Sequence, residues 1–388
     1  MKSIKYLGFV LLLLLVAVAL IVGCAPKAAP TTGPIKVGLI LPYTGFAAAY
    51  GPFNQEALEL KLDEIGWEIA GRKVVLIVED EACDPAVAVT KAKKLVERDK
   101  VDVIVGPQLS SSALGVAKYT AASRTPCLIP DWQPYSILTQ GGENVFMAGG
   151  TGGSHRLAEY AYSELGYRTV TVMHEDFEAG YDFTQGFIDA FEALGGKMIQ
   201  RQATPINEMD FAPYITNMKD ADAMVLWYAA PIALLQQYKA AGKTMPILCT
   251  NGTPMGELFL GIMGDNALGI IGATTYTAEI NTSRNRLHVQ NYQQKYGRHP
   301  ESPEGMATYA NFTMYVEAVK KTNGDTTPEK VIKAMHELKD VETPRGLESY
   351  NEDGSPIIPD YIGKVVKKGD RYCVEVLKKY PWWSPEAD

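Results

Sequence analysis

The chain has few of the residues from which catalytic and metal sites are built. Its 388 residues include five histidines and five cysteines. The histidines are scattered, without an H-x-x-x-H pair or a His/Cys group of zinc-binding spacing. No glycine stands two residues after Ser154, so this serine does not lie in the G-x-S-x-G turn of a hydrolase. We therefore expect no enzymatic activity, no metal ion and no cofactor.

Clusters of basic residues are also missing. Lys and Arg total 37 against 45 Asp and Glu, and the formal net charge is −8. No stripe of basic and aromatic residues indicates a nucleic-acid partner. The acidic residues Asp80, Glu81 and Asp84 are expected in a solvated loop, because a calcium site needs more oxygen ligands in register. The glycines of 149–153 lack the dinucleotide-binding G-x-G-x-x-G spacing.

A long apolar run occurs only at the N-terminus. Lys2 and Lys5 precede the apolar segment 7–21, which is typical of a secretory signal. The following residues, 21–24, resemble a bacterial lipobox, whose cysteine is diacylated and becomes the new N-terminus. We expect a signal peptide over 1–23, lipid on Cys24, a flexible tether over 24–34, and a protein on the extracytoplasmic face of the membrane or in the periplasm. The alternative is a transmembrane anchor, for which the run is a little short.

Strand and helix patterns alternate along most of the remaining chain. The first half has apolar strand patterns at 35–41, 72–79, 101–105, 126–129 and 145–148, with helical patterns between most of them. After the glycine-rich junction the alternation restarts, with strands at 169–174, 197–202, 223–228, 246–250 and 269–275. Such alternation predicts βαβ units and parallel sheets covered on both faces. Two successive halves predict two α/β lobes.

The last third of the chain has a different pattern. Helices are predicted at 284–296, 306–322 and 328–338, with no strand between them, so they cannot form a third α/β lobe. We expect the chain to cross between lobes near 149–153, 277–282 and 343–344. The predicted fold is α/β, with two doubly wound parallel-sheet lobes joined by a multi-strand hinge. Lobe 1 is residues 36–151 plus 279–344, and lobe 2 is 152–278 plus 345–380. Hinge closure around a ligand is common in such an arrangement.

The segment 101–122 is the strongest candidate for a binding element. An apolar strand ends at Gly106-Pro107, and Ser110, Ser111 and Ser112 stand where a helix begins. A serine at a helix start caps free N–H groups, and these groups can instead point at a bound anion. Ligands of open α/β sheets bind beyond the carboxyl ends of the strands. The alternative is a capped helix without a ligand.

Several segments together resemble those of the leucine/isoleucine/valine-binding proteins, which have the type I periplasmic-binding-protein fold of ABC importers. The resemblance lies in the lipobox, GLILPYTGFAAAYG (38–51), DEACDP (80–85) and VIVGPQLSSS (103–112). It implies a monomeric solute-binding lipoprotein that delivers a small molecule to ABC permease and ATPase subunits in the membrane. The alternative is a ligand-sensing receptor domain of the same fold that reports to a signalling partner.

The resemblance also implies roles for individual residues. Ser110, with Ser111 beside it, matches the family's binder of the ligand carboxylate. The neighbouring family positions, a small residue and a threonine, hold Gln133 and Pro134 here, which leaves Trp132 or Gln133 as a replacement. The family also pairs Cys83 with a cysteine at the position of Leu109, so we predict no such disulfide.

Family members that bind amino acids place acids around the ligand ammonium. The matching positions hold Thr151 and Asn251 here, unless an alignment shift brings Glu257 or Asp131 into place. An ammonium buried without a carboxylate is costly. We therefore hypothesise that an ordinary α-amino acid is not the best ligand.

Aromatic residues follow many of the predicted strands. Aromatic rings at these ends suit a flat or cyclic ligand, although any one of them could belong to the core. The expected ligands, in order, are an aromatic or cyclic carboxylate, an aliphatic amino acid and a small amide. The aromatic candidates are Tyr43, Tyr50, Trp132, Phe177, Tyr181, Trp227 and Tyr228.

Overall fold

The computed structural model describes residues 33–149, 152–250, 255–300 and 303–381. The chain divides into two units, Met1–Gly33 and Pro34–Asp388, and the second contains all the elements below. Cys24, Thr151 and Asn251 lie outside the described residues. No helix in the described ranges is long and apolar enough to cross a membrane.

The first sheet has six strands in the order β2-β3-β1-β4-β5-β6. All neighbours are parallel except β2 and β3, which form an antiparallel pair. Apolar strands of this kind are buried on both faces by helices. The strands are β1 (Ile35–Leu41), β2 (Glu68–Ile69), β3 (Arg72–Asp80), β4 (Val103–Val105), β5 (Cys127–Trp132) and β6 (Val145–Gly149).

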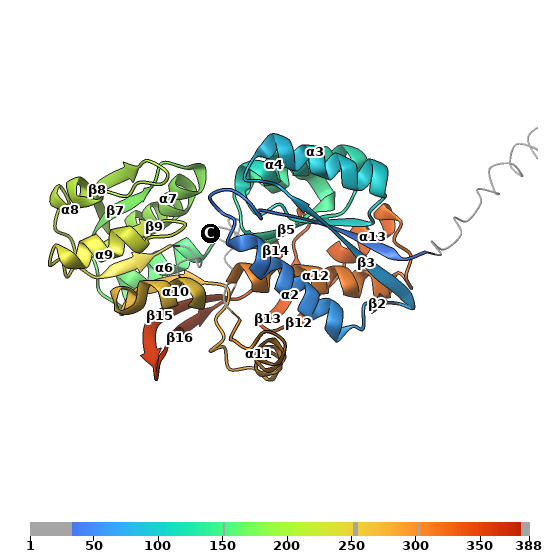
Figure 1. Ribbon diagram of the computed structural model, residues 1–388. Coiled ribbons are helices and arrows are strands. Elements are labelled where there is room, and N and C mark those ends of the chain that lie inside the picture. Colours follow the sequence, from blue (N-terminus) through green and yellow to red (C-terminus); the bar gives the residue numbers. More distant parts are fainter. Residues whose placement is uncertain (1–32, 150–151, 251–254, 301–302, 382–388) are drawn as a thin grey trace, which may run out of the picture. The chain divides into compact units, whose positions relative to one another are not determined.

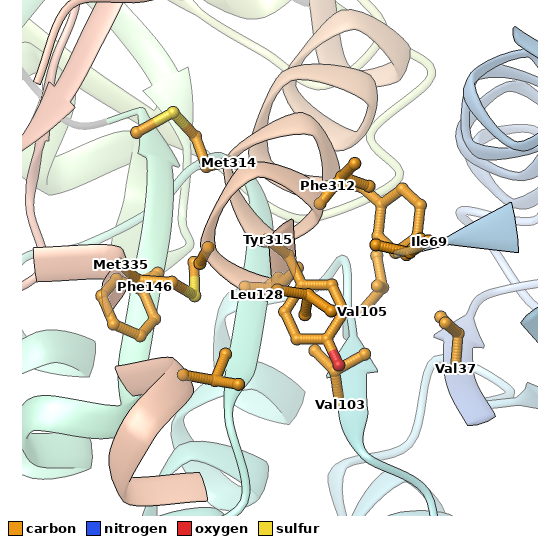
Figure 2. Close-up of a cluster of buried hydrophobic side chains, with 14 of the residues drawn as sticks. Val37, Ile69, Val103, Val105, Leu128, Phe146, Phe312, Met314, Tyr315 and Met335 are labelled. Atoms are coloured by element: carbon orange, nitrogen blue, oxygen red, sulfur yellow. The ribbon is translucent and has the colours of Figure 1, made fainter. Parts of the chain in front are cut away.

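Helices cover both faces of this sheet (Figure 1). On one face, Val37, Val103 and Val105 of the strands pack against Phe312 and Tyr315 of α12, as Figure 2 shows. Helix α12 is buried along almost its whole length, which explains its apolar sequence. This face carries α2 (Tyr50–Glu64), α12 (Pro303–Lys321) and α13 (Pro328–His336), and the other carries α3 (Pro85–Lys93), α4 (Ser110–Ser123) and α5 (Ser136–Gly141).

The second sheet has seven strands in the order β16-β15-β11-β10-β9-β7-β8. Strands β7 to β11 run parallel, whereas β15 is antiparallel to both β11 and β16. The strands are β7 (Thr169–Glu175), β8 (Lys197–Thr204), β9 (Ala223–Trp227), β10 (Ile247–Cys249), β11 (Ile271–Thr274), β15 (Asp360–Lys368) and β16 (Arg371–Tyr380). Helices α6 (Gly152–Ser163) and α7 (Glu178–Ala193) cover one face, and α8 (Ala212–Thr216), α9 (Ile232–Ala240) and α10 (Glu257–Met263) cover the other.

The predicted α/β fold with two helix-covered sheets is confirmed. The chain passes from the first sheet to the second between Gly149 and Gly152 and returns before α11 (Ser283–Tyr296), which packs on α2. It passes to the second sheet again between Ile357 and Asp360, not near 343–344 as predicted.

The chain crosses later than predicted because it first forms a small antiparallel sheet. This sheet consists of β12 (Val341–Thr343), β13 (Gly346–Tyr350) and β14 (Pro356–Ile357). The sequence-based division assigns β13 and β14 to the second lobe. However, β13 contacts α13, and Tyr350 packs on Phe146 of β6 with ring centroids 4.9 Å apart. A short strand can pair with any free edge, so its pattern alone does not reveal which sheet it joins.

A buried ion pair links segments that lie near the points where the chain passes between the two large sheets. Arg345 is fully buried, and its Nε and Nη2 donate to the two carboxylate oxygens of Glu348 at 2.8 Å each. Arg345 Nη1 donates to the carbonyl oxygen of Ala148 at 2.8 Å, and the Tyr361 hydroxyl donates to the carbonyl oxygen of Arg345 at 2.7 Å. One side chain thus ties the end of β6 to the β12–β13 turn, and its backbone ties that turn to β15.

Arg345→Met should lower the free energy of unfolding by about 3–5 kcal/mol, because it leaves the Glu348 carboxylate buried without a partner. The double variant Arg345→Met/Glu348→Met should be more stable than the single variant, because neither charge is then buried alone. Urea unfolding monitored by circular dichroism measures both values. A double variant no more stable than Arg345→Met would contradict this account.

Candidate functional site

A cavity of about 180 Å³ lies where strands of both sheets end at their carboxyl termini. Residues that follow β1, β4 and β5 form one wall, and residues at the ends of β7, β8 and β9 form the other. This is the position at which α/β sheets bind ligands. The lining residues are Phe46, Ala47, Ala49, Tyr50, Gln108, Leu109, Ser110, Gln133, Glu175, Phe177, Ala179, Ile206, Trp227, Ala229, Ala230 and Phe259.

The first wall contains the start of helix α4. Its N-cap is Leu109, which has no side-chain cap bond, and Ser110 is the first helical residue. The expectation that a serine caps this helix is therefore corrected: the N-cap position lies one residue earlier, on a leucine whose side chain has no oxygen to accept a hydrogen bond. The first turn still presents N–H groups and the positive end of the helix dipole, which favour an anion.

Two glutamines form the floor beside this helix start. Gln133 Nε2 donates to the Gln108 carbonyl oxygen at 2.7 Å, and Asn54 Nδ2 donates to Gln108 Oε1 at 3.1 Å. Gln133 is 2% exposed, and its Oε1 is buried without a hydrogen-bond partner in the described structure.

Aromatic rings build the second wall. Trp227 stacks between Phe177 and Phe183, with ring centroids 6.2 Å apart in both pairs. The buried Trp227 Nε1 donor has no partner among the described residues. The Tyr50 hydroxyl donates to the Ala229 carbonyl oxygen at 3.2 Å, so the two walls already touch.

The cavity also holds a carboxylate, Glu175. Its Oε2 accepts the Ala229 N–H at 3.2 Å. Burial raises the pKa of the Glu175 carboxyl above its ordinary value, and the Ala229 N–H opposes that shift. This side chain could accept a hydrogen bond from a ligand or pair with a ligand cation.

Some of the predicted ligand-binding residues come together at this cavity: Tyr50, Ser110, Gln133, Phe177 and Trp227. The side chain of Trp132, at the end of β5, is outside the described set, as are Thr151 and Asn251. Whether the cavity residues contact a ligand stays a prediction.

Other predicted residues lie outside the cavity lining. Tyr228 follows Trp227 directly, so it points to the opposite face of the sheet, where its hydroxyl lies 3.1 Å from Thr204 Oγ1. Tyr43 packs against the core of the first sheet and donates to Gln55 Oε1 at 2.6 Å.

The remaining two are at the surface. Ser111 is exposed, because neighbouring residues of a helix point about 100° apart. Tyr181 is 41% exposed and donates to Asp176 Oδ1 at 2.9 Å.

The sequence interpretation missed several cavity residues, including Phe46, Gln108, Glu175, Ile206 and Phe259. Glu175 matters most, because the argument against an amino-acid ligand considered Glu257 and Asp131 as possible carboxylates but not this residue. A signal existed: Glu175 is the last residue of β7, at the same sheet edge as Phe177. Phe259 lies in α10, a helix that the sequence pattern did not predict.

The expected solvated acidic loop is also corrected. Asp80 accepts the backbone N–H groups of Tyr43 and Ala82, and Asp84 caps α3. Glu81 is fully buried, and its Oε1 accepts the Gln108 N–H at 3.0 Å, beneath the cavity floor. These carboxyl groups therefore hold the loop against the elements that form the site.

Comparison with known proteins gives a consistent result. A family model described as periplasmic binding protein matches residues 34–370. The Leu/Ile/Val-binding protein homolog 3 of Brucella melitensis is 26% identical over 336 residues, which are 84% of this chain and 90% of the relative.

Two solved structures are similar over nearly their whole length. The solute binding protein of an ABC transporter from Rhodopseudomonas palustris BisB5, in complex with 3,4-dihydroxy benzoic acid, is 28% identical with a TM-score of 0.85, covering 92% of this chain and 99% of that one. The ABC transporter substrate-binding protein from Sphaerobacter thermophilus is 27% identical with a TM-score of 0.84, covering 90% and 98%.

Glu81→Gln should stabilise the protein at alkaline pH. Burial raises the pKa of Glu81 to about 7, although hydrogen bonds from Ser112 and the Gln108 and Leu109 N–H groups oppose the shift. As the pH rises from the ordinary value of 4.5 through 7, the unfolded state releases this proton first, so the wild type loses stability. The glutamine variant does not titrate, and its advantage should grow to at most ~3 kcal/mol.

Urea unfolding at pH 5 and pH 8 measures this difference, with Glu352→Gln at an exposed position as the matched control. An advantage that does not change with pH would contradict the assignment.

Proposed function

Because this chain belongs to the periplasmic binding protein family, we propose that it is the extracytoplasmic solute-binding lipoprotein of a branched-chain-amino-acid-type ABC importer. Its ligand is a small carboxylate-bearing molecule, which it delivers to ABC permease and ATPase subunits. A lipid on Cys24 holds it at the membrane. The observation that carries the proposal is the cavity that has the start of α4 in one wall and an aromatic stack in the other.

The residue types of the cavity lining support the proposal that neutral hydrogen-bond donors hold an anionic ligand. None of the described residues that line it is Lys, Arg or His. A ligand carboxylate would receive hydrogen bonds from the Ser110 hydroxyl and from N–H groups of the first turn of α4. Trp227 and Phe177 offer ring faces to an apolar body, which suits an aromatic or cyclic acid. The relative that holds 3,4-dihydroxy benzoic acid supports this ligand class.

Binding proceeds by hinge closure. The ligand first docks at Ser110, and the second lobe then brings Phe177 and Trp227 over it. Contacts to both lobes give the closed state the higher affinity, which is required for the ligand to drive closure. The Tyr50–Ala229 hydrogen bond is one contact that the closed state gains.

An aliphatic amino acid is the second candidate ligand, and Glu175 favours it. The carboxylate lies in the cavity wall, where it could pair with an ammonium group. The Leu/Ile/Val-binding relative also supports this candidate. Glu175→Gln would weaken binding of leucine strongly if an ammonium pairs there, and would have little effect on an acid without an amine.

Calorimetric titration with benzoate, 3,4-dihydroxybenzoate, leucine, isoleucine and valine tests the ligand class. We expect an aromatic acid to bind more tightly than any of the three amino acids. Ser110→Ala should weaken binding by roughly 1–3 kcal/mol, because the hydroxyl pairs with a buried carboxylate. Ser163→Ala, at an exposed position of α6, is the matched control. Tight binding of leucine with no measurable binding of the acids would reject the aromatic-acid proposal.

Small-angle scattering tests closure. The radius of gyration should decrease when the ligand identified by calorimetry is added, and should not change with an acid that does not bind. An unchanged radius at saturation would reject the hinge mechanism.

A further inference from the structure

A buried carboxyl group, Glu81, lies behind the helix start that forms the first wall of the cavity. The residues 108–110 line the cavity, and Glu81 is not among its described lining residues. Glu81 is fully buried, and its Oε1 accepts the Gln108 N–H at 3.0 Å. The Leu109 N–H and the Ser112 hydroxyl also form hydrogen bonds to this carboxyl group. The start of α4 therefore already holds one carboxyl group of the protein, outside the cavity.

The charged groups around Glu81 are acidic. Burial and the charge of Asp80 both disfavour its ionised form, and the groups of α4 that face it are N–H groups and the Ser112 hydroxyl. Burial, and then the charges of Glu81 and Asp80, raise the pKa of the Cys83 thiol on the same loop. No described residue that lines the cavity is Lys, Arg or His, and Glu175 adds a further carboxyl group there. Nothing in the described lining can therefore offset a second negative charge at the start of α4.

Glu81 can hold a proton without losing its hydrogen-bond partners. Glu81 Oε2 and Ser112 Oγ are both buried, and neither forms a hydrogen bond to a third group among the described residues. A hydroxyl group can donate to an ionised carboxyl group and accept from a protonated one. The Ser112 hydroxyl can therefore serve both states while Oε1 accepts the Gln108 N–H. Burial raises the pKa of the Glu81 carboxyl to about 7, so this proton exchanges near neutral pH.

We propose that binding of a carboxylate ligand at the start of α4 is coupled to the uptake of one proton by Glu81. Two carboxylates held by the same short run of N–H groups repel each other, and protonation of one of them removes the repulsion. The proton comes from the solvent and stays on Glu81, while the ligand keeps its negative charge. The inference rests on the proposed binding of a carboxylate and adds the proton that accompanies it.

The coupling sets how affinity depends on pH. Below pH 7, Glu81 is mostly protonated before the ligand arrives, so binding needs no further proton. Above pH 7, the free protein has lost this proton and must regain it, and each unit of pH costs up to ~10-fold in affinity. The coupling holds for an aromatic acid and for an amino acid alike, because both present a carboxylate to α4.

Calorimetry of the wild-type protein measures the proton directly. Benzoate, cyclohexanecarboxylate and leucine are titrated at pH 8 in phosphate and in Tris, whose ionisation enthalpies differ, so the difference in observed enthalpy gives the number of protons taken up. For a ligand that binds, we expect roughly 0.5–1 proton per molecule. In phosphate, its affinity should be about 10-fold lower at pH 8 than at pH 6.

Two variants assign the proton to one carboxyl group. Glu81→Gln keeps an acceptor for the Gln108 N–H and does not titrate, so it should bind the ligand without proton uptake and with equal affinity at pH 6 and pH 8. Glu175→Gln removes the carboxyl group of the cavity wall and should retain the uptake. Glu352→Gln, at an exposed position, is the matched control and should also retain it.

A carboxylate that binds to the wild type at pH 8 without proton uptake would overturn the inference and leave the proposed function standing. This measurement does not depend on how the variants fold. Uptake that persists in Glu81→Gln, or that disappears in Glu175→Gln, would assign the proton to another group and also overturn the inference. Failure of every carboxylate to bind would reject the proposed function itself, and the inference with it.

Discussion

The Arg345 side chain is the contact on which the geometry between the two sheets depends. It bonds to Glu348 within the small third sheet and to the end of β6, and its backbone receives the Tyr361 hydroxyl. Burying a guanidinium is costly unless every donor finds an acceptor, and here two carboxylate oxygens and a carbonyl oxygen serve that purpose. The end of β6, the β12–β13 turn and β15 are therefore tied together near the points where the chain passes between the two sheets.

The cavity itself combines an apolar wall with a few neutral hydrogen-bonding groups. No described lining residue carries a positive charge, and the carboxylate of Glu175 is present. A negative charge on a ligand would therefore be met by N–H groups of α4 and by hydroxyls, whereas a positive charge would be met by Glu175. The helix dipole contributes only a partial positive charge and backbone donors carry no formal charge, so the ligand's other groups also decide which molecule binds.

Local sequence patterns predicted the features that depend only on neighbouring residues. The apolar run 35–41 predicted β1 with the bounds that the structure has. The position of aromatic residues after strands located Phe177 and Trp227. The same reasoning misplaced Tyr228, because successive residues of a strand face opposite sides, and the pattern did not say which side was the cavity. It also passed over Glu175, which directly follows the predicted strand 169–174 and is the last residue of β7.

The sequence by itself determined the alternation of strands and helices, and hence two helix-covered sheets, because hydrophobic period depends only on neighbouring residues. It also predicted a binding site at the carboxyl ends of the strands, which is where the cavity lies. The tertiary structure alone decided that β13 and β14 pack with the first sheet, and that Ser110 and not Ser111 lines the cavity. It also decided that Gln133 Oε1 and Trp227 Nε1 are buried without a partner among the described residues. Each of these depends on contacts between residues far apart in the chain, which no local pattern encodes.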